Sequence, residues 1–166
     1  MWLGGVLGSH FGDYESGFRF GKLGVDLVQN RGLNRFKARV YLGFGSLVNF
    51  WTQPLQTGFA LMRRAFDAAQ EIGDLTYAAY AYYDLIGHFL FGGDPLSEVQ
   101  REAEIALELA SKARFGLMVN GFTSQLRLIR MLRGLTAEFG SFNDDQFDEV
   151  QFERLLERDP SDPVCS

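Results

Sequence analysis

The sequence predicts an all-α protein, a right-handed solenoid of helical hairpins, on the basis of two observations. The first is an internal repeat, because Asp13, Pro54 and Pro95 stand 41 residues apart, and a fixed period of about 20 to 50 residues is typical of repeat arrays. The second is that apolar and small residues after each of these positions follow the i, i+3, i+4, i+7 spacing of one helix face. Each repeat is therefore expected to begin with an amphipathic helix.

Alignment of the three segments on this period supports the repeat. Small residues share one column and acidic residues another, and these are Gly24, Ala65 and Ala106, and then Asp26, Asp67 and Glu108. We expect the small residues to let neighbouring helices approach closely, as stacking in a solenoid requires.

A second helix is expected in each repeat, at 33–50, 75–91 and 117–133. The middle one is almost entirely apolar or aromatic, which is typical of a helix covered by neighbours on most sides. Gly32, Gly73 and Gly116 stand where a helix needs a residue in the left-handed conformation at its C-terminal cap.

We expect one helical-repeat segment over 1–166 that is part of a longer chain. Its predicted parts are a truncated helix at 1–10, hairpins at 13–51, 54–93 and 95–134, a loop at 135–145 and a terminal helix at 146–158. Phe139 and Phe142 in the loop are expected to fold back onto the preceding helices. Uncapped apolar ends predict that the chain can associate with itself.

Composition excludes several classes of function. Hydrophobic residues make up 46% of the chain and charged residues 22%, so disorder is not expected. The net charge of −5 provides no basic field for nucleic acid or anionic lipid. The single cysteine, Cys165, excludes an internal disulfide framework and favours a cytoplasmic location. The most apolar stretch, 75–93, contains Asp84 and His88, so a membrane span is not expected.

One helix carries a candidate small-ligand site made of Tyr77, Tyr80, Asp84 and His88. Asp84 and His88 are four residues apart and share a helix face, so the carboxylate could orient the imidazole. The preferred interpretation is an internally satisfied polar pair in a tyrosine-rich core.

Arg127, Arg130 and Arg133 form a row that could bind a phosphate or an acidic protein partner. The preferred alternative is a solvated face, because cations near the end of a helix also complement its dipole. An acidic run at 144–149 lacks the glycine and glutamate of a calcium-binding loop, and a helix start explains it.

No catalytic machinery is visible in the sequence. His10 and His88 have no metal-ligand spacing, and there is neither a phosphate-binding loop nor a nucleophile motif. We therefore expect a chain that is not an enzyme and has no cofactor or metal.

Several ordered stretches resemble a known family. They are 11–21, 37–41, 73–78, 93–102, 112–116 and 125–130. Together they resemble the tetratricopeptide-like helical region of large bacterial signalling proteins that combine a serine/threonine-kinase-like domain, an AAA-type ATPase module and a sensor histidine kinase. The resemblance implies a region between the ATPase and the histidine kinase of an ATP-binding parent protein, and no catalytic residue of the family matches here.

This resemblance implies a regulatory scaffold or protein-interaction module in two-component signal transduction. Its partners would be other proteins or flanking domains of the same chain. A small-ligand sensor with a tyrosine-rich pocket between repeats is the alternative function.

Overall fold

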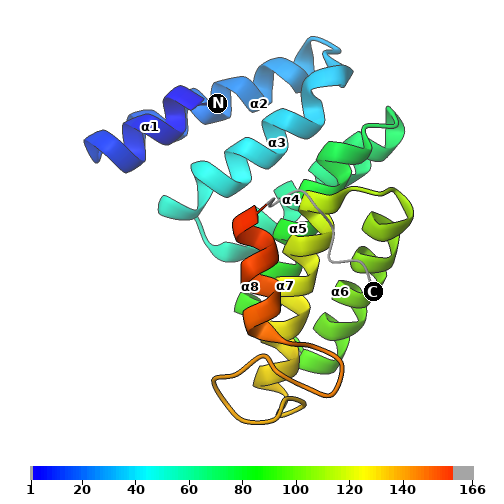
Figure 1. Ribbon diagram of the computed structural model, residues 1–166. Coiled ribbons are helices and arrows are strands. Elements are labelled where there is room, and N and C mark those ends of the chain that lie inside the picture. The colour runs from blue at the N-terminus through cyan, green and yellow to red at the C-terminus, as the bar shows by residue number, and fades with distance from the viewer. Residues whose placement is uncertain (1, 159–166) are drawn as a thin grey trace. The chain divides into compact units, whose positions relative to one another are not determined.

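The computed structural model describes residues 2–158, and these residues are helical outside the connecting loops (Figure 1). Within this range, β-pairing is limited to an isolated bridge between Asp144 and Phe147. The predicted all-α class is confirmed. Cys165 lies outside the described residues.

The chain divides into two compact units, Met1–His88 and Phe89–Ser166, and the division falls within one helix, α5. In the first unit the elements are α1 (Trp2–Phe11), α2 (Tyr14–Asn30), α3 (Asn34–Leu47), the short 3-10 helix η1 (Asn49–Trp51), α4 (Leu55–Glu71) and most of α5 (Leu75–Gly92). The second unit contains α6 (Leu96–Lys112), α7 (Gly116–Leu132) and α8 (Glu149–Arg158). Helices that follow one another pack in pairs, as α1 does with α2, α3 with α4 and α6 with α7.

The predicted period of 41 residues is present in the helix boundaries. Helices α2, α4 and α6 begin at residues 14, 55 and 96 and end at 30, 71 and 112. Helices α3, α5 and α7 begin at 34, 75 and 116. Although the ends of this second set differ, both helices of each repeat start in the same register.

Small residues allow close helix contacts, as the sequence predicts. Ala65 in α4 and Ala106 in α6 are 0% and 1% exposed. The tightest approach joins α1 to α2, where a Cβ atom added to Gly17 would lie 2.6 Å from the carbonyl oxygen of Gly4. The two backbones are in direct contact there, which only glycine permits.

Two of the three predicted glycine caps are confirmed. Gly32 and Gly73 have φ angles of 63° and 70°, in the left-handed region. The third prediction is wrong, because Gly116 is the first residue of α7 and Arg114 has the positive φ, at 53°. The glycine lies two residues too late to follow the end of α6, so a residue with a Cβ adopts this conformation, at a cost of about 1 kcal/mol.

The region after α7 differs from the sequence prediction. Helix α8 begins at Glu149 rather than near 146, because Asp144 and Phe147 pair with each other. Asp148 then caps the helix by accepting a hydrogen bond from the backbone N–H of Gln151 at 2.9 Å. Phe139 is 83% exposed, so the prediction that it folds back is wrong. Polar contacts, described below, anchor the loop instead.

Candidate functional site

The carboxylate of Asp84 on α5 is held by α3 of the same unit. The hydroxyl of Ser46 donates a hydrogen bond to Asp84 Oδ2. His88 does not use this carboxylate, since its Nδ1 lies 2.8 Å from the backbone carbonyl oxygen of Asp84. A carbonyl oxygen only accepts hydrogen bonds, so Nδ1 carries the proton and Nε2 is an acceptor in the neutral ring.

Burial raises the pKa of the Asp84 carboxyl above its ordinary value, while the Ser46 hydrogen bond and the nearby His88 act in the opposite direction. Burial prevails because water is replaced by surroundings that solvate a charge poorly. The site therefore favours the uncharged acid more than water does.

The Nε2 atom of His88 faces α4. A Cβ atom added to Gly58 would lie 2.7 Å from this nitrogen and 3.8 Å from Nδ2 of Asn49. Asn49 is 1% exposed, and its Nδ2 has no hydrogen-bond partner. Ser46, Asn49, Asp84 and His88 thus form a polar cluster inside the first unit, and Gly58 leaves room for the imidazole.

The two tyrosines belong to a different part of α5. Their rings meet edge to face, with centroids 5.9 Å apart, and the guanidinium carbon of Arg39 lies 4.7 Å from the centroid of Tyr77. Tyr77 precedes His88 by eleven residues, which is about 16 Å along a helix. These contacts divide the four predicted ligand residues into two groups, since Tyr77 packs with Arg39 and Asp84 with Ser46.

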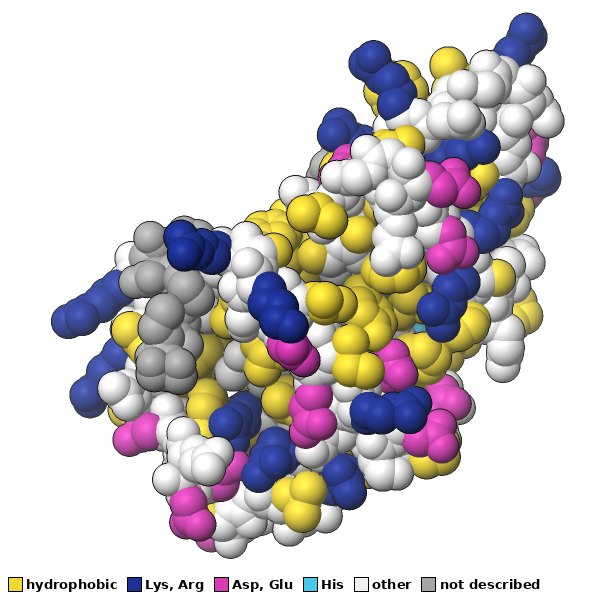
Figure 2. Space-filling view, turned by 90° about the vertical axis from the view of Figure 1, so that its right-hand side faces the viewer, with side chains coloured by type: hydrophobic (Ala, Val, Ile, Leu, Met, Phe, Trp, Pro, Cys, Tyr) yellow, Lys and Arg dark blue, Asp and Glu magenta, His cyan; other side chains and the backbone are white. Residues whose placement is uncertain are grey.

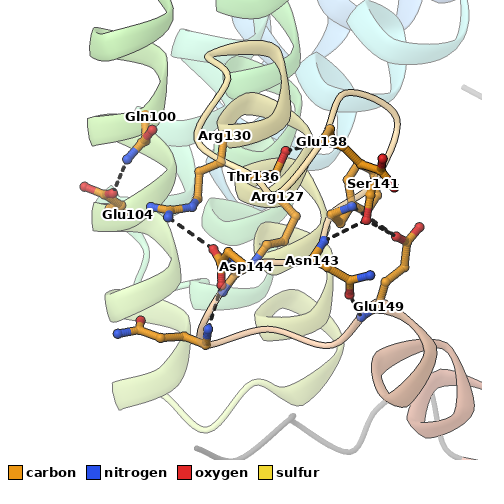
Figure 3. A network of polar contacts seen from close by, with 12 residues as sticks. Gln100, Glu104, Arg127, Arg130, Thr136, Glu138, Ser141, Asn143, Asp144 and Glu149 are labelled. Carbon is orange, nitrogen blue, oxygen red and sulfur yellow. Dashed lines mark hydrogen bonds and ion pairs between the residues drawn. The ribbon is translucent and has the colours of Figure 1, made fainter.

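In the second unit, two of the three predicted arginines converge on one carboxylate (Figure 3). Arg127 and Arg130 both donate to Oδ2 of Asp144, at 2.5 and 3.1 Å. The three side chains are 15%, 30% and 13% exposed. The Arg127 guanidinium also lies 4.0 Å from the ring centroid of Phe147. These two arginines therefore do not form a solvated face. They fasten the loop to α7.

Charge and burial act against each other in this cluster. Burial lowers the pKa of Arg127, although Asp144 partly compensates. For Asp144, burial acts to raise the pKa, but the backbone N–H of Gln146 and the two arginines outweigh it and leave the pKa below its ordinary value. The carboxylate is therefore held in its charged form, as an ion pair requires.

Arg133 does not join its neighbours. Its NH1 donates to Oε1 of Gln100 at 2.6 Å, and Nε2 of Gln100 donates to Glu104 at 2.7 Å. This chain of hydrogen bonds ties the end of α7 to α6. The arginine row seen in the sequence is thus split between an ion pair with the loop and a contact between helices.

The start of α8 is fixed to the same loop. Glu149 accepts a hydrogen bond from the backbone N–H of Phe142 at 3.0 Å, while its own N–H donates to Oδ1 of Asn143 at 2.8 Å. Next to these contacts is a pocket of about 550 Å³, lined by Arg130, Leu135, Thr136, Ala137 and residues 143–146. Sequence reasoning missed the role of Asp144, because the sequence does not show which acid of the run at 144–149 would reach back to α7.

Two further classes of site were sought among residues 2–158. No group of three or more His, Cys, Asp or Glu side chains in this range could hold a metal ion. None of the helices described is long and apolar enough to cross a membrane.

Comparison with known proteins gives one partial similarity. The chain is 31% identical over 90 residues to the protein described as hybrid signal transduction histidine kinase G of Dictyostelium discoideum. The match covers 54% of this chain and 3% of that much longer protein. No protein-family model and no solved structure matches the chain.

Proposed function

We propose that this chain is a regulatory scaffold, or protein-interaction module, of a multidomain signal-transduction kinase. Its helical hairpins would stack as a right-handed, tetratricopeptide-like solenoid. A solenoid exposes a long surface while each repeat contacts only its neighbours, which suits a region that binds other proteins or flanking domains.

The observation that supports this proposal most is the recurrence of helix boundaries every 41 residues over α2 to α7. A regular array of hairpins is typical of interaction modules. The partial similarity to a signal transduction histidine kinase supports the signalling context. The bacterial origin of the family, the two-component context and a cytoplasmic location are parts of the proposal that come from the sequence alone.

The proposal also holds that the segment has no catalytic activity of its own. Its polar clusters support this view, because they are used for internal contacts. Ser46 engages Asp84, and Arg127 and Arg130 engage Asp144. Any binding of ATP would then belong to other parts of the parent kinase.

A thermal-shift experiment on the purified chain separates the scaffold from a small-ligand sensor. A ligand that binds the folded state raises stability by RT ln(1 + [L]/Kd). We expect neither Mg-ATP nor a panel of small metabolites to raise the melting temperature. A metabolite that raises it in a concentration-dependent way, and fails to do so after Asp84→Ala, would favour the sensor.

Small-angle X-ray scattering supplies the positive test of the solenoid. Stacked hairpins give an elongated particle, whereas a compact bundle of the same mass follows the radius of gyration of globular domains. A radius of gyration that matches a compact sphere of 166 residues would contradict the solenoid.

A further inference from the structure

Helix α2 exposes a row of large apolar side chains on the face that points away from its own unit. Phe20, Leu23 and Leu27 are 50%, 53% and 45% exposed. The opposite face of α2 is buried at Gly17, Gly21, Val25 and Val28. The exposed row is therefore not the packed face of the helix.

The row borders a groove and carries charge beside it. A hollow of about 310 Å³ is lined by Ser16, Arg19, Phe20 and Leu23. Asp26 lies along the same helix and pairs with Lys22 at 3.2 Å, with the two side chains 45% and 59% exposed. Figure 2 shows that such yellow hydrophobic side chains reach the surface between charged ones on the face in view.

The corresponding positions one repeat later are covered. Leu61 and Ala68 in α4, 41 residues after Phe20 and Leu27, are 7% and 6% exposed. Helix α3 lies against Leu61, since a Cβ atom added to Gly45 would be 3.3 Å from the Cβ of Leu61. Within the same unit, this helix position is thus one that accepts a second helix.

Helix α1 does not provide the same cover for α2. Its close contacts with α2 are at Gly17 and Gly21, on the buried face. Phe20 and Leu27 are left open where their counterparts in α4 are covered.

We propose that this face of α2 is a homodimer interface, in which a second copy of the chain packs its own α2 antiparallel across a two-fold axis at Leu23. In this arrangement a residue n positions before Leu23 lies opposite the residue n positions after it in the partner. Leu23 meets Leu23 of the partner subunit, and Phe20 lies beside Leu27 of the partner subunit. The apolar row is complementary to itself.

The charged residues favour the same arrangement. Arg19 and Asp26 lie on one side of the apolar row, four residues before and three residues after Leu23. The two-fold axis brings Arg19 next to Asp26 of the partner subunit, and the reverse pair forms by symmetry. A row with charges of a single sign would repel its copy, whereas this row attracts it.

The test is the molecular mass of the purified full chain, measured by light scattering over a micromolar to millimolar concentration series. We expect a monomer–dimer equilibrium that Leu23→Asp shifts towards monomer by at least about tenfold in dissociation constant. Leu109→Asp in α6 is the matched control, because Leu109 is also 53% exposed. It should leave the dissociation constant unchanged.

A charge reversal identifies the interface more closely. Arg19→Glu and Asp26→Arg should each weaken the dimer, and the double variant should recover most of the loss. Circular dichroism checks that each variant keeps its helix content. A monomer throughout the series, a dimer insensitive to Leu23→Asp, or a double variant weaker than both single ones would overturn the proposal. The proposal does not depend on the scaffold function, which can hold for a monomer.

Discussion

The glycine contact between α1 and α2 makes a quantitative prediction about Gly17→Ala. In a helix without neighbours, replacing glycine by alanine stabilises by up to about 1 kcal/mol, because alanine loses less backbone entropy on folding. Here the new Cβ would lie 2.6 Å from the carbonyl oxygen of Gly4, about 0.8 Å short of the 3.4 Å at which ordinary contact begins. The obstacle is backbone, which cannot move as a flexible side chain does.

Overpacking of this kind costs about 1 to 3 kcal/mol, so the two effects partly cancel. We expect Gly17→Ala to lower the free energy of unfolding by about 1 to 2 kcal/mol. The matched control is Gly87→Ala in α5, where a Cβ atom would meet nothing within 4 Å. This variant should gain about 0.5 to 1 kcal/mol.

The assay is urea unfolding of both variants and the parent chain, followed by far-ultraviolet circular dichroism and analysed by linear extrapolation. The opposite signs of the two changes are the decisive result. If Gly17→Ala stabilises as much as Gly87→Ala does, the backbones of α1 and α2 are not in contact, and the account of this helix pair is wrong.

Further predictions concern the polar clusters and the repeat. Ser46→Ala should lower the free energy of unfolding at pH 7 by about 1 to 3 kcal/mol by leaving the Asp84 carboxylate without its donor, whereas Asp84→Asn, which keeps the acceptor, should be neutral or stabilising in urea unfolding. Because the folded-state pKa of Asp84 is raised, its contribution is fully present below its ordinary pKa of 3.8 and is lost as pH rises through the folded value, so the advantage of Asn should vanish in acid. Asp144→Asn should cost about 2 kcal/mol by weakening the pairing of Arg127 and Arg130, and limited proteolysis should then cut the loop at 135–148 faster. Since the folded pKa of Asp144 is lowered, this cost should be full above the ordinary value and disappear as pH falls through the folded one; an equal cost at low pH would contradict the ion pair. Ala106→Trp, at a position 1% exposed, should destabilise by about 1 to 3 kcal/mol, while Glu108→Trp on the exposed side of α6 should change stability little, and equal effects would show that the helix register is wrong.

The helical parts of the fold could be predicted because their signals are local. The spacing of Asp13, Pro54 and Pro95 gave the period, and the boundaries of α2, α4 and α6 repeat it. Apolar periodicity and capping residues act within a few positions along the chain, so a sequence displays them directly.

Contacts that depend on distant residues could not be predicted in the same way. The sequence places Asp84 beside His88, yet the partner of the carboxylate is Ser46 on α3, 38 residues earlier. Asp144 likewise reaches back 17 residues to Arg127. Such pairs depend on how helices and loops pack, and hydrophobic periodicity carries no information about them. Phe139 was misplaced for this reason, since polar groups rather than aromatic ones anchor the loop.

The recurrence of helix boundaries also bears on how such a chain can change its length by recombination. Helix α2 ends at Asn30 and α3 begins at Asn34, and α5 begins at Leu75 with the same phase. An in-frame loss of residues 34–74 would join α2 to α5 through a connector of unchanged length. Gains or losses of 41 residues thus preserve the alternation of helices, whereas a change of half that size would interrupt one. Evolution can therefore lengthen or shorten this array in whole repeats without redesigning its junctions.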